Sequence, residues 1–179
     1  MMRMFVMIIL VWSGVMTAEA QTYRTEKCKV SFFSSAPLED IKAENKEAIG
    51  VFNAGTGDFA FVVQIKGFQF AKSLMQEHFN ENFMESDQYP RGTFEGKIEG
   101  YDLTKVGQQQ VTASGTMNIH GVAQPMDVKG ELTASGEKVT MKAVFPVKLE
   151  DHDIDIPKIL FQKIAEEVEV TVYFEFKED

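Results

Sequence analysis

Residues 111–120 read VTASGTMNIH, and in them small or apolar side chains alternate with polar ones. Val111, Met117 and Ile119 occupy odd positions, whereas every even position is polar. Successive side chains of a strand point to opposite faces of a sheet, so this period of two predicts a strand with one apolar and one wet face. Similar patterns predict eight further strands, at residues 29–35, 39–45, 47–53, 58–66, 91–99, 126–132, 139–149 and 168–176.

Two segments depart from this period and predict short helices. In residues 73–84, Met75 and Phe79 lie four positions apart, which places both on one helical face. In residues 158–167, an apolar spacing of four follows Pro157, a residue suited to the first turn of a helix. Neither segment is long enough to build a helical core, so the chain is predicted to be all-β with one or two short helices.

The predicted strands favour a closed barrel over a sandwich. Several contain about ten residues, or ~30 Å at ~3.4 Å per residue, and short turns such as residues 120–121 join them. Gly96, Gly115 and Gly130 fall on the apolar parity of their strands. They are interpreted as bends that let the sheet close or as positions that leave room inside, and both interpretations can hold. We therefore expect a single antiparallel β-barrel.

The N-terminus is predicted to be an export signal. Residues 1–20 contain one basic residue, Arg3, then an apolar run at 4–12 and a small-x-small site at 18–20. This run is too short to span a bilayer, which takes about 20 residues. We expect a signal peptide at 1–20, a barrel domain at 21–179, and no stable membrane insertion after cleavage.

The charge and the cysteine content limit the partners and the sources of stability. The 179 residues carry 18 Lys and Arg against 27 Asp and Glu, a net charge of −9, so nucleic acid is not an expected partner. Cys28 is the single cysteine and can form no internal disulfide. It shares parity with Val30 and Phe32, so we expect it to point inward. The oligomeric state stays open, with a homodimer as one alternative.

The sequence favours neither a metal site nor a catalytic site. Residues 151–155, DHDID, resemble the start of a calcium loop, but Ile156 stands where that loop needs Gly and Gln162 where it needs Glu. A solvated acidic loop is the preferred interpretation. The sequence contains no Gly-x-Ser-x-Gly elbow or His-Glu-x-x-His helix. We predict no metal site, no catalytic residue and no cofactor, and hence a protein that is not an enzyme.

Several blocks of sequence together carry a family resemblance. They are HF at 78–79, FMESDQYP at 83–90, TFEGKI at 93–98 and GTMNIHGV at 115–122, followed by Pro125. Over residues 25–176 the chain resembles the YceI-like family of secreted lipid- or polyisoprenoid-binding proteins. It departs at residues 25–31, TEKCKVS, where many members carry an Asp and then a His-Ser pair. The resemblance implies a lipocalin-like barrel, most often periplasmic, whose interior holds an isoprenoid quinone, a polyisoprenoid or a fatty-acid derivative.

The candidate ligand contacts are inward-facing Phe and Met side chains together with one nearby histidine. They are Phe59, Phe61, Phe68, Phe70, Met75, His78, Phe79, Phe83, Phe94, Met117, Met126, Met141 and Phe145. For each one taken alone, ordinary barrel core is the favoured interpretation, but collectively they suit an apolar pocket. We expect binding, carriage or sequestration of a long apolar molecule. The alternatives are a ligand-free barrel that acts as an envelope stress or protein-interaction module and, less favoured, an enzyme acting on a lipid.

Overall fold

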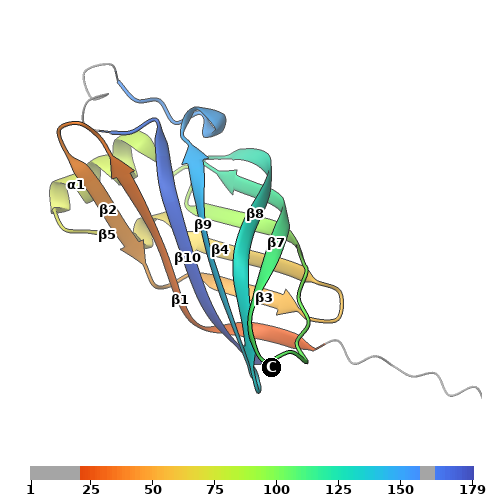
Figure 1. Ribbon diagram of the computed structural model, residues 1–179. Helices are drawn as coiled ribbons and strands as arrows, with labels where there is room; N and C mark the ends of the chain where they lie inside the picture. Colours follow the sequence, from red (N-terminus) through yellow and green to blue (C-terminus); the bar gives the residue numbers. More distant parts are fainter. Residues whose placement is uncertain (1–20, 158–163) are drawn as a thin grey trace, which may run out of the picture.

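The computed structural model describes residues 21–157 and 164–179 and contains one antiparallel sheet (Figure 1). Eight of its ten strands close into a barrel in the order β1-β3-β4-β6-β7-β8-β9-β10, with β10 paired back to β1. The strands are β1 Thr22–Ser35, β2 Asp40–Asn45, β3 Ile49–Asn53, β4 Asp58–Gln64, β5 Gln69–Phe70, β6 Arg91–Glu99, β7 Gly107–Ile119, β8 Val122–Ser135, β9 Lys138–Lys148 and β10 Glu167–Glu178. The predicted all-β, lipocalin-like antiparallel barrel is confirmed.

Strand β1 has two different neighbours on one of its edges. Its first residues pair with β3, as in Thr22 opposite Asn53, whereas residues 30–35 pair with β2. Its other edge pairs with β10 along most of its length. Strands β2 and β5 therefore form a short extension beside the barrel, and α1 lies next to them in Figure 1.

The predicted strand positions are confirmed, but several strands are longer than expected. Strand β1 begins at Thr22 and β7 at Gly107, ahead of the predicted starts at 29 and 111. The first residues of both strands are mostly polar, so the alternation of apolar and polar side chains is not visible there. The two-residue strand β5 was not predicted.

The first predicted helix is present in two parts. Residues Ser73–His78 form the α-helix α1, and Phe79–Phe83 continue it as a π-helical turn, η2. Short 3-10 turns occur at Ile65–Gly67 (η1) and Glu150–His152 (η3). Of the second predicted helix, residues 158–163 lie outside the described residues, and Glu167 already begins β10. The predicted signal peptide at 1–20 also lies outside the described residues.

One end of the barrel, where β1 begins and β10 ends, is filled with side chains. We call it the closed end, and the opposite end, beside α1, the open end (Figure 1). Phe52 and Phe176 are completely buried at the closed end, and Tyr23 packs against Phe52 with ring centroids 6.1 Å apart. This aromatic core supplies the apolar burial that stabilises a chain without a disulfide.

The three glycines on the inward parity mark close approaches of the backbone. Gly96 and Gly115 are opposite each other on β6 and β7. A Cβ atom on Gly115 would lie 2.3 Å from the carbonyl oxygen of Glu95, and one on Gly130 would lie 2.8 Å from that of Lys142. These distances exclude a side chain, so the structure supports the interpretation that the glycines let the barrel close.

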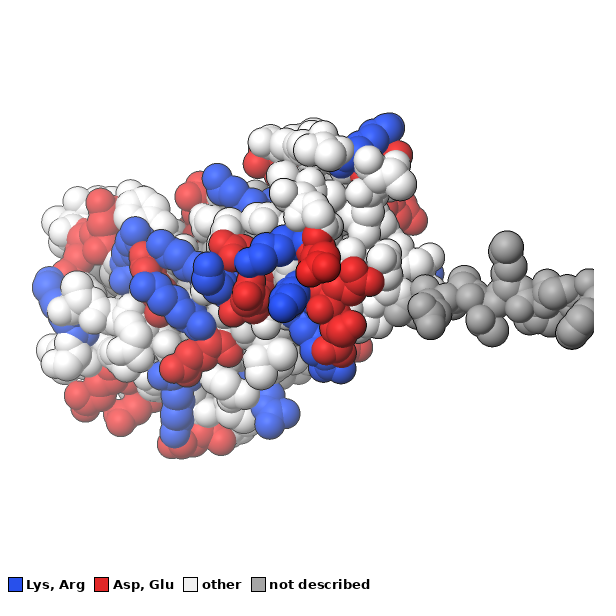
Figure 2. All heavy atoms as spheres, turned by 90° about the horizontal axis from the view of Figure 1, so that it is seen from below, with Lys and Arg blue, Asp and Glu red and all other residues white. Residues whose placement is uncertain are grey.

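The exterior carries charges of both signs. On the face in Figure 2, seen from below the view of Figure 1, acidic and basic side chains are interspersed. Ion pairs near the closed end include Arg24 with Asp179, 2.6 Å between Nε and Oδ2, and Lys138 with Glu26, 2.7 Å between Nζ and Oε2. Within residues 21–157 and 164–179, no helix is long and apolar enough to cross a membrane.

Candidate functional site: an apolar cavity in the open half of the barrel

A cavity of about 420 Å³ occupies the open half of the barrel. Its wall consists of aliphatic side chains of β9 and β10, such as Val147 and Val170, of Phe32 from β1, and of aromatic side chains from the segment around α1. The volume lies within the range of ≈300–1,000 Å³ that is usual for small-molecule sites. The alternation of inward and outward side chains along each strand produces this wall, because the inward-facing residues of neighbouring strands are apolar around the cavity.

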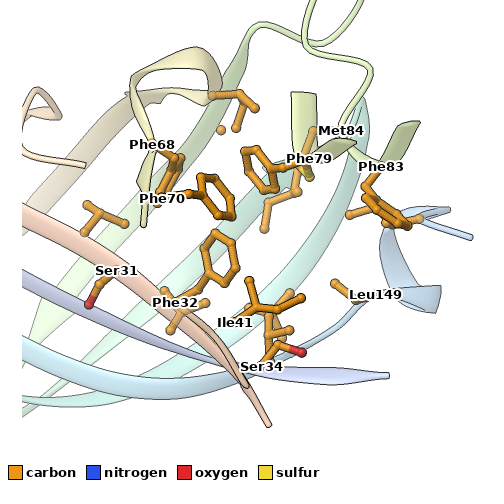
Figure 3. Close-up of a pocket in the computed structure, with 18 of the residues that line it drawn as sticks. Ser31, Phe32, Ser34, Ile41, Phe68, Phe70, Phe79, Phe83, Met84 and Leu149 are labelled. Atoms are coloured by element: carbon orange, nitrogen blue, oxygen red, sulfur yellow. The ribbon is translucent and has the colours of Figure 1, made fainter. Parts of the chain in front are cut away.

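Four phenylalanines close the side of the cavity beneath α1. The ring of Phe32 is stacked on that of Phe79, with centroids 5.5 Å apart, and Phe70 lies 5.0 Å from Phe79. Phe68 contacts both Phe32 and Phe79. Figure 3 shows these rings turned toward one another in the cavity wall. No residue of α1 is itself buried, so Phe79, just beyond the helix, anchors this segment to the barrel.

The few polar groups of the wall lie mainly at the rim, which we define as Glu39, Lys72 and His78. Lys72 Nζ is 2.7 Å from Glu39 Oε1, and this ion pair joins the start of β2 to the start of α1. Near the open end of β1, the buried hydroxyl of Ser34 accepts a hydrogen bond from the backbone N–H of Ala165 at 2.9 Å. The cavity is therefore apolar inside and charged at its rim.

Comparison with known proteins identifies the fold and the family. The family model of the YceI-like domain matches residues 21–176. The chain belongs to the YceI-like family. No curated protein matches the chain.

Solved YceI-like structures share this architecture at low sequence identity. A polyisoprenoid binding domain from Saccharophagus degradans superposes with a TM-score of 0.76 at 15% identity, covering 90% of this chain and 100% of that chain. BcnA of Burkholderia cenocepacia gives 0.71 at 17% identity, covering 83% and 95%. The YceI protein of Campylobacter jejuni gives 0.59 at 12% identity, covering 99% of both chains. At these identities the likeness establishes the fold alone.

Nine of the thirteen predicted ligand contacts line the large cavity of this YceI-like barrel. They are Phe61, Phe68, Phe70, Met75, His78, Phe79, Phe83, Met117 and Phe145. Phe59, Phe94 and Met141 instead border a second, smaller cavity of about 60 Å³, nearer the closed end. Met126 borders neither cavity and packs, half-buried, against the core. The sequence placed all four of these side chains inside the barrel correctly but did not indicate their depth.

The prediction missed the Phe32 ring and most of the aliphatic wall. Phe32 lies on the predicted inward parity of β1, and Val147, Val168 and Val170 lie on that of β9 and β10. The signal for them was therefore present. The emphasis on aromatic and methionine side chains excluded the valines, whereas Phe32 was excluded because the candidate aromatics come from the segment around the predicted helix and from later strands.

The histidine turn after β7 is structural in this YceI-like barrel. His120 and Gly121 have positive φ angles of 53° and 78° and form the predicted hairpin turn between β7 and β8. His120 Nδ1 is 3.1 Å from the carbonyl oxygen of His152, and Nε2 is 3.1 Å from Glu85 Oε2. Both ring nitrogens thus lie within hydrogen-bond distance of an oxygen atom. The turn joins the segment after η2 to η3.

The acidic loop and the cysteine are placed as expected. Asp151 and Asp153 are exposed, whereas His152 between them is buried and its Nδ1 lies 3.2 Å from the carbonyl oxygen of Val122. In the described residues, no group of three His, Cys, Asp or Glu side chains is arranged to hold a metal ion. Cys28 packs half-buried against the core, and this burial raises the pKa of its thiol.

Proposed function

We propose that this protein binds a long-chain apolar molecule and carries or sequesters it, with the apolar chain in the large cavity. The observation that carries the proposal is the cavity itself, which is apolar inside, charged at its rim and built by strands that close on one another. A polar headgroup fits the rim, where Lys72 and Glu39 are exposed to water on one side. We place the chain inward and the headgroup outward on this basis.

The size of the cavity supports binding of a chain rather than of a compact polar metabolite. A water-sized group occupies roughly 30 Å³ in a liquid. The cavity of about 420 Å³ therefore holds on the order of 14 heavy atoms of a ligand. Burial of each CH₂ stabilises a complex by ~0.8 kcal/mol, so about ten buried methylenes contribute ~8 kcal/mol before ordering costs. That contribution is sufficient for useful affinity without any specific polar contact.

The family supports the same class of ligand. The Saccharophagus degradans structure is described as a polyisoprenoid binding domain, and its fold matches this chain over nearly its whole length. Our candidates are an isoprenoid quinone, a polyisoprenoid or a fatty-acid derivative. We further propose binding rather than catalysis, and export to the periplasm, where such a carrier would move apolar molecules through water.

Two measurements test the proposal. Protein purified without detergent should release a lipid into organic solvent that mass spectrometry detects, or should take up a fatty acid or quinone saturably. Trp12 is the only tryptophan, so Phe79→Trp in the chain from residue 21 onward reports on the cavity without background. Phe33→Trp is the matched control, because Phe33 is 38% exposed on β1 next to the inward Phe32.

We expect the indole introduced by Phe79→Trp to change its emission saturably with added ligand, and the one introduced by Phe33→Trp to remain unchanged. If the protein releases no co-purifying lipid and also shows no saturable uptake, the proposed carrier function is contradicted. That result would favour the alternative, a ligand-free interaction module. The side chains that fill the closed half are the observation on which that alternative rests.

A further inference from the structure

Four side chains separate the large cavity from the smaller one along the barrel. Phe61 of β4, Met117 of β7, Phe145 of β9 and Val172 of β10 border both cavities, and we call these four residues the partition. They come from four different strands. The large cavity therefore adjoins the smaller one at the partition and does not extend past it to the closed end.

The partition is supported firmly from the side of the closed end. The Phe61 ring is stacked on that of Phe94, with centroids 5.9 Å apart and planes at 15°, and lies 5.6 Å from Phe174. Phe94 is only 2% exposed, and its ring lies against Gly115, where a Cβ would come within 2.8 Å of it. Phe94 and Phe174 therefore hold one side of the Phe61 ring, and the smaller cavity lies beside it.

We propose that the partition, and Phe61 above all, sets the maximum length of apolar chain that the protein buries. This inference rests on the proposed function and adds a specificity to it. A chain that enters from the rim meets the partition after on the order of 14 heavy atoms. Longer chains leave their remaining carbons at the rim in water, where these add nothing to affinity.

The length limit has a measurable signature. Each CH₂ that is buried tightens binding about fourfold, so affinity rises steeply with chain length and then stops rising at the limit. Phe61→Ala removes the ring between the cavities and joins the smaller one of about 60 Å³ to the larger. At ~30 Å³ per heavy atom the smaller cavity adds room for about two carbons, and the deleted ring leaves room for a few more. The limit should then move to longer chains by on the order of six carbons.

The experiment measures dissociation constants for saturated fatty acids from decanoic to eicosanoic acid, by displacement of a fluorescent fatty acid below the micellar concentrations. The wild-type curve should level off near tetradecanoic acid, and that of Phe61→Ala at a longer chain. Phe52→Ala is the matched control, because it deletes an equal ring that is fully buried at the closed end and borders neither cavity. Its curve should level off where the wild type does.

The outcomes are distinguishable. No saturable binding of any chain length would overturn the proposed function and the length limit together. Binding without levelling, or a levelling point that Phe61→Ala leaves in place while its circular dichroism remains native, would overturn the length limit alone. Should Phe61→Ala fail to fold, Phe61→Leu and Met117→Ala open the same partition more mildly. An unmoved levelling point in both would refute the inference.

Discussion

A single methyl group at Gly115 should prevent the barrel from closing as it does. Gly115 of β7 faces Gly96 of β6, and an ideal Cβ on it would lie 2.3 Å from the carbonyl oxygen of Glu95 and 2.7 Å from Gly96 Cα. Carbon atoms in contact are ordinarily 3.5–4.0 Å apart, so the two strands must separate by roughly 1 Å. Two of the three nearest atoms are backbone, which cannot turn aside as a side chain can.

The cost follows from two opposing effects. Overpacking of a core costs about 1–3 kcal/mol, and strained hydrogen bonds between β6 and β7 add about 1 kcal/mol. Replacement of Gly by Ala also restricts the unfolded chain and so stabilises by about 0.4–1 kcal/mol. We expect Gly115→Ala to lower the free energy of unfolding by about 2 kcal/mol. Gly55→Ala is the control, since its nearest atom is Asn53 Oδ1 at 3.4 Å, an ordinary contact.

Urea unfolding followed by far-ultraviolet circular dichroism measures both variants. With a slope of about 2 kcal/mol per molar urea, the midpoint of Gly115→Ala should fall by about 1 M. That of Gly55→Ala should stay or rise slightly. Equal midpoints for Gly115→Ala and wild type would refute the reasoning, because they would mean that β6 and β7 have room at this crossing.

Three further variants test other parts of the barrel. Burial raises the pKa of Tyr101, whose hydroxyl donates a hydrogen bond to the Ala54 carbonyl. The contribution of this group to the free energy of unfolding is therefore fully present below the ordinary pKa of about 10, and it is lost as the pH rises through the raised pKa. Urea midpoints at rising alkaline pH should therefore fall less in Tyr101→Phe than in wild type, and parallel curves would contradict this. His120→Ala removes the hydrogen bonds of the ring to Glu85 and to the His152 carbonyl and its contact with Tyr89, and it should cost about 1–2 kcal/mol in thermal unfolding. An unchanged melting temperature would show that these contacts do not stabilise the fold. Phe52→Ala, at a site with 0% exposure, should cost about 3–5 kcal/mol in urea, and a loss below 1 kcal/mol would mean that the closed end repacks.

The start of β1 shows why the alternation could not be followed everywhere. Tyr23 and Val30 are both buried although one is odd and the other even, because the pairing with β10 slips between Thr25 and Lys27. A strand with such an irregularity changes parity part-way along its length. The polar run between the two residues carries no local sign of this, so the prediction began only at residue 29.

The candidate site was predicted in composition but not in depth. Alternation states whether a side chain points inward, and it placed Phe59, Phe61 and Phe94 inside the barrel correctly. Only the pairing of β4 with β6 and the stagger around the barrel decide that Phe61 borders the large cavity while Phe59 and Phe94 lie beyond it. Depth along the axis depends on register between strands, which is a non-local property.

The sequence by itself determined that this chain is a single antiparallel barrel with an apolar interior, because period-two alternation and turn residues are local and repeat along the chain. Its resemblance to the YceI-like family came from separate blocks of residues. Only the tertiary structure decided that the open half holds a large cavity, that the closed half is filled apart from a cavity of about 60 Å³, and that Phe61 and Met117 lie between the two cavities. The physical reason is that a cavity is the space left over when side chains from distant strands meet. Its size depends on how those strands are aligned rather than on the character of any one residue.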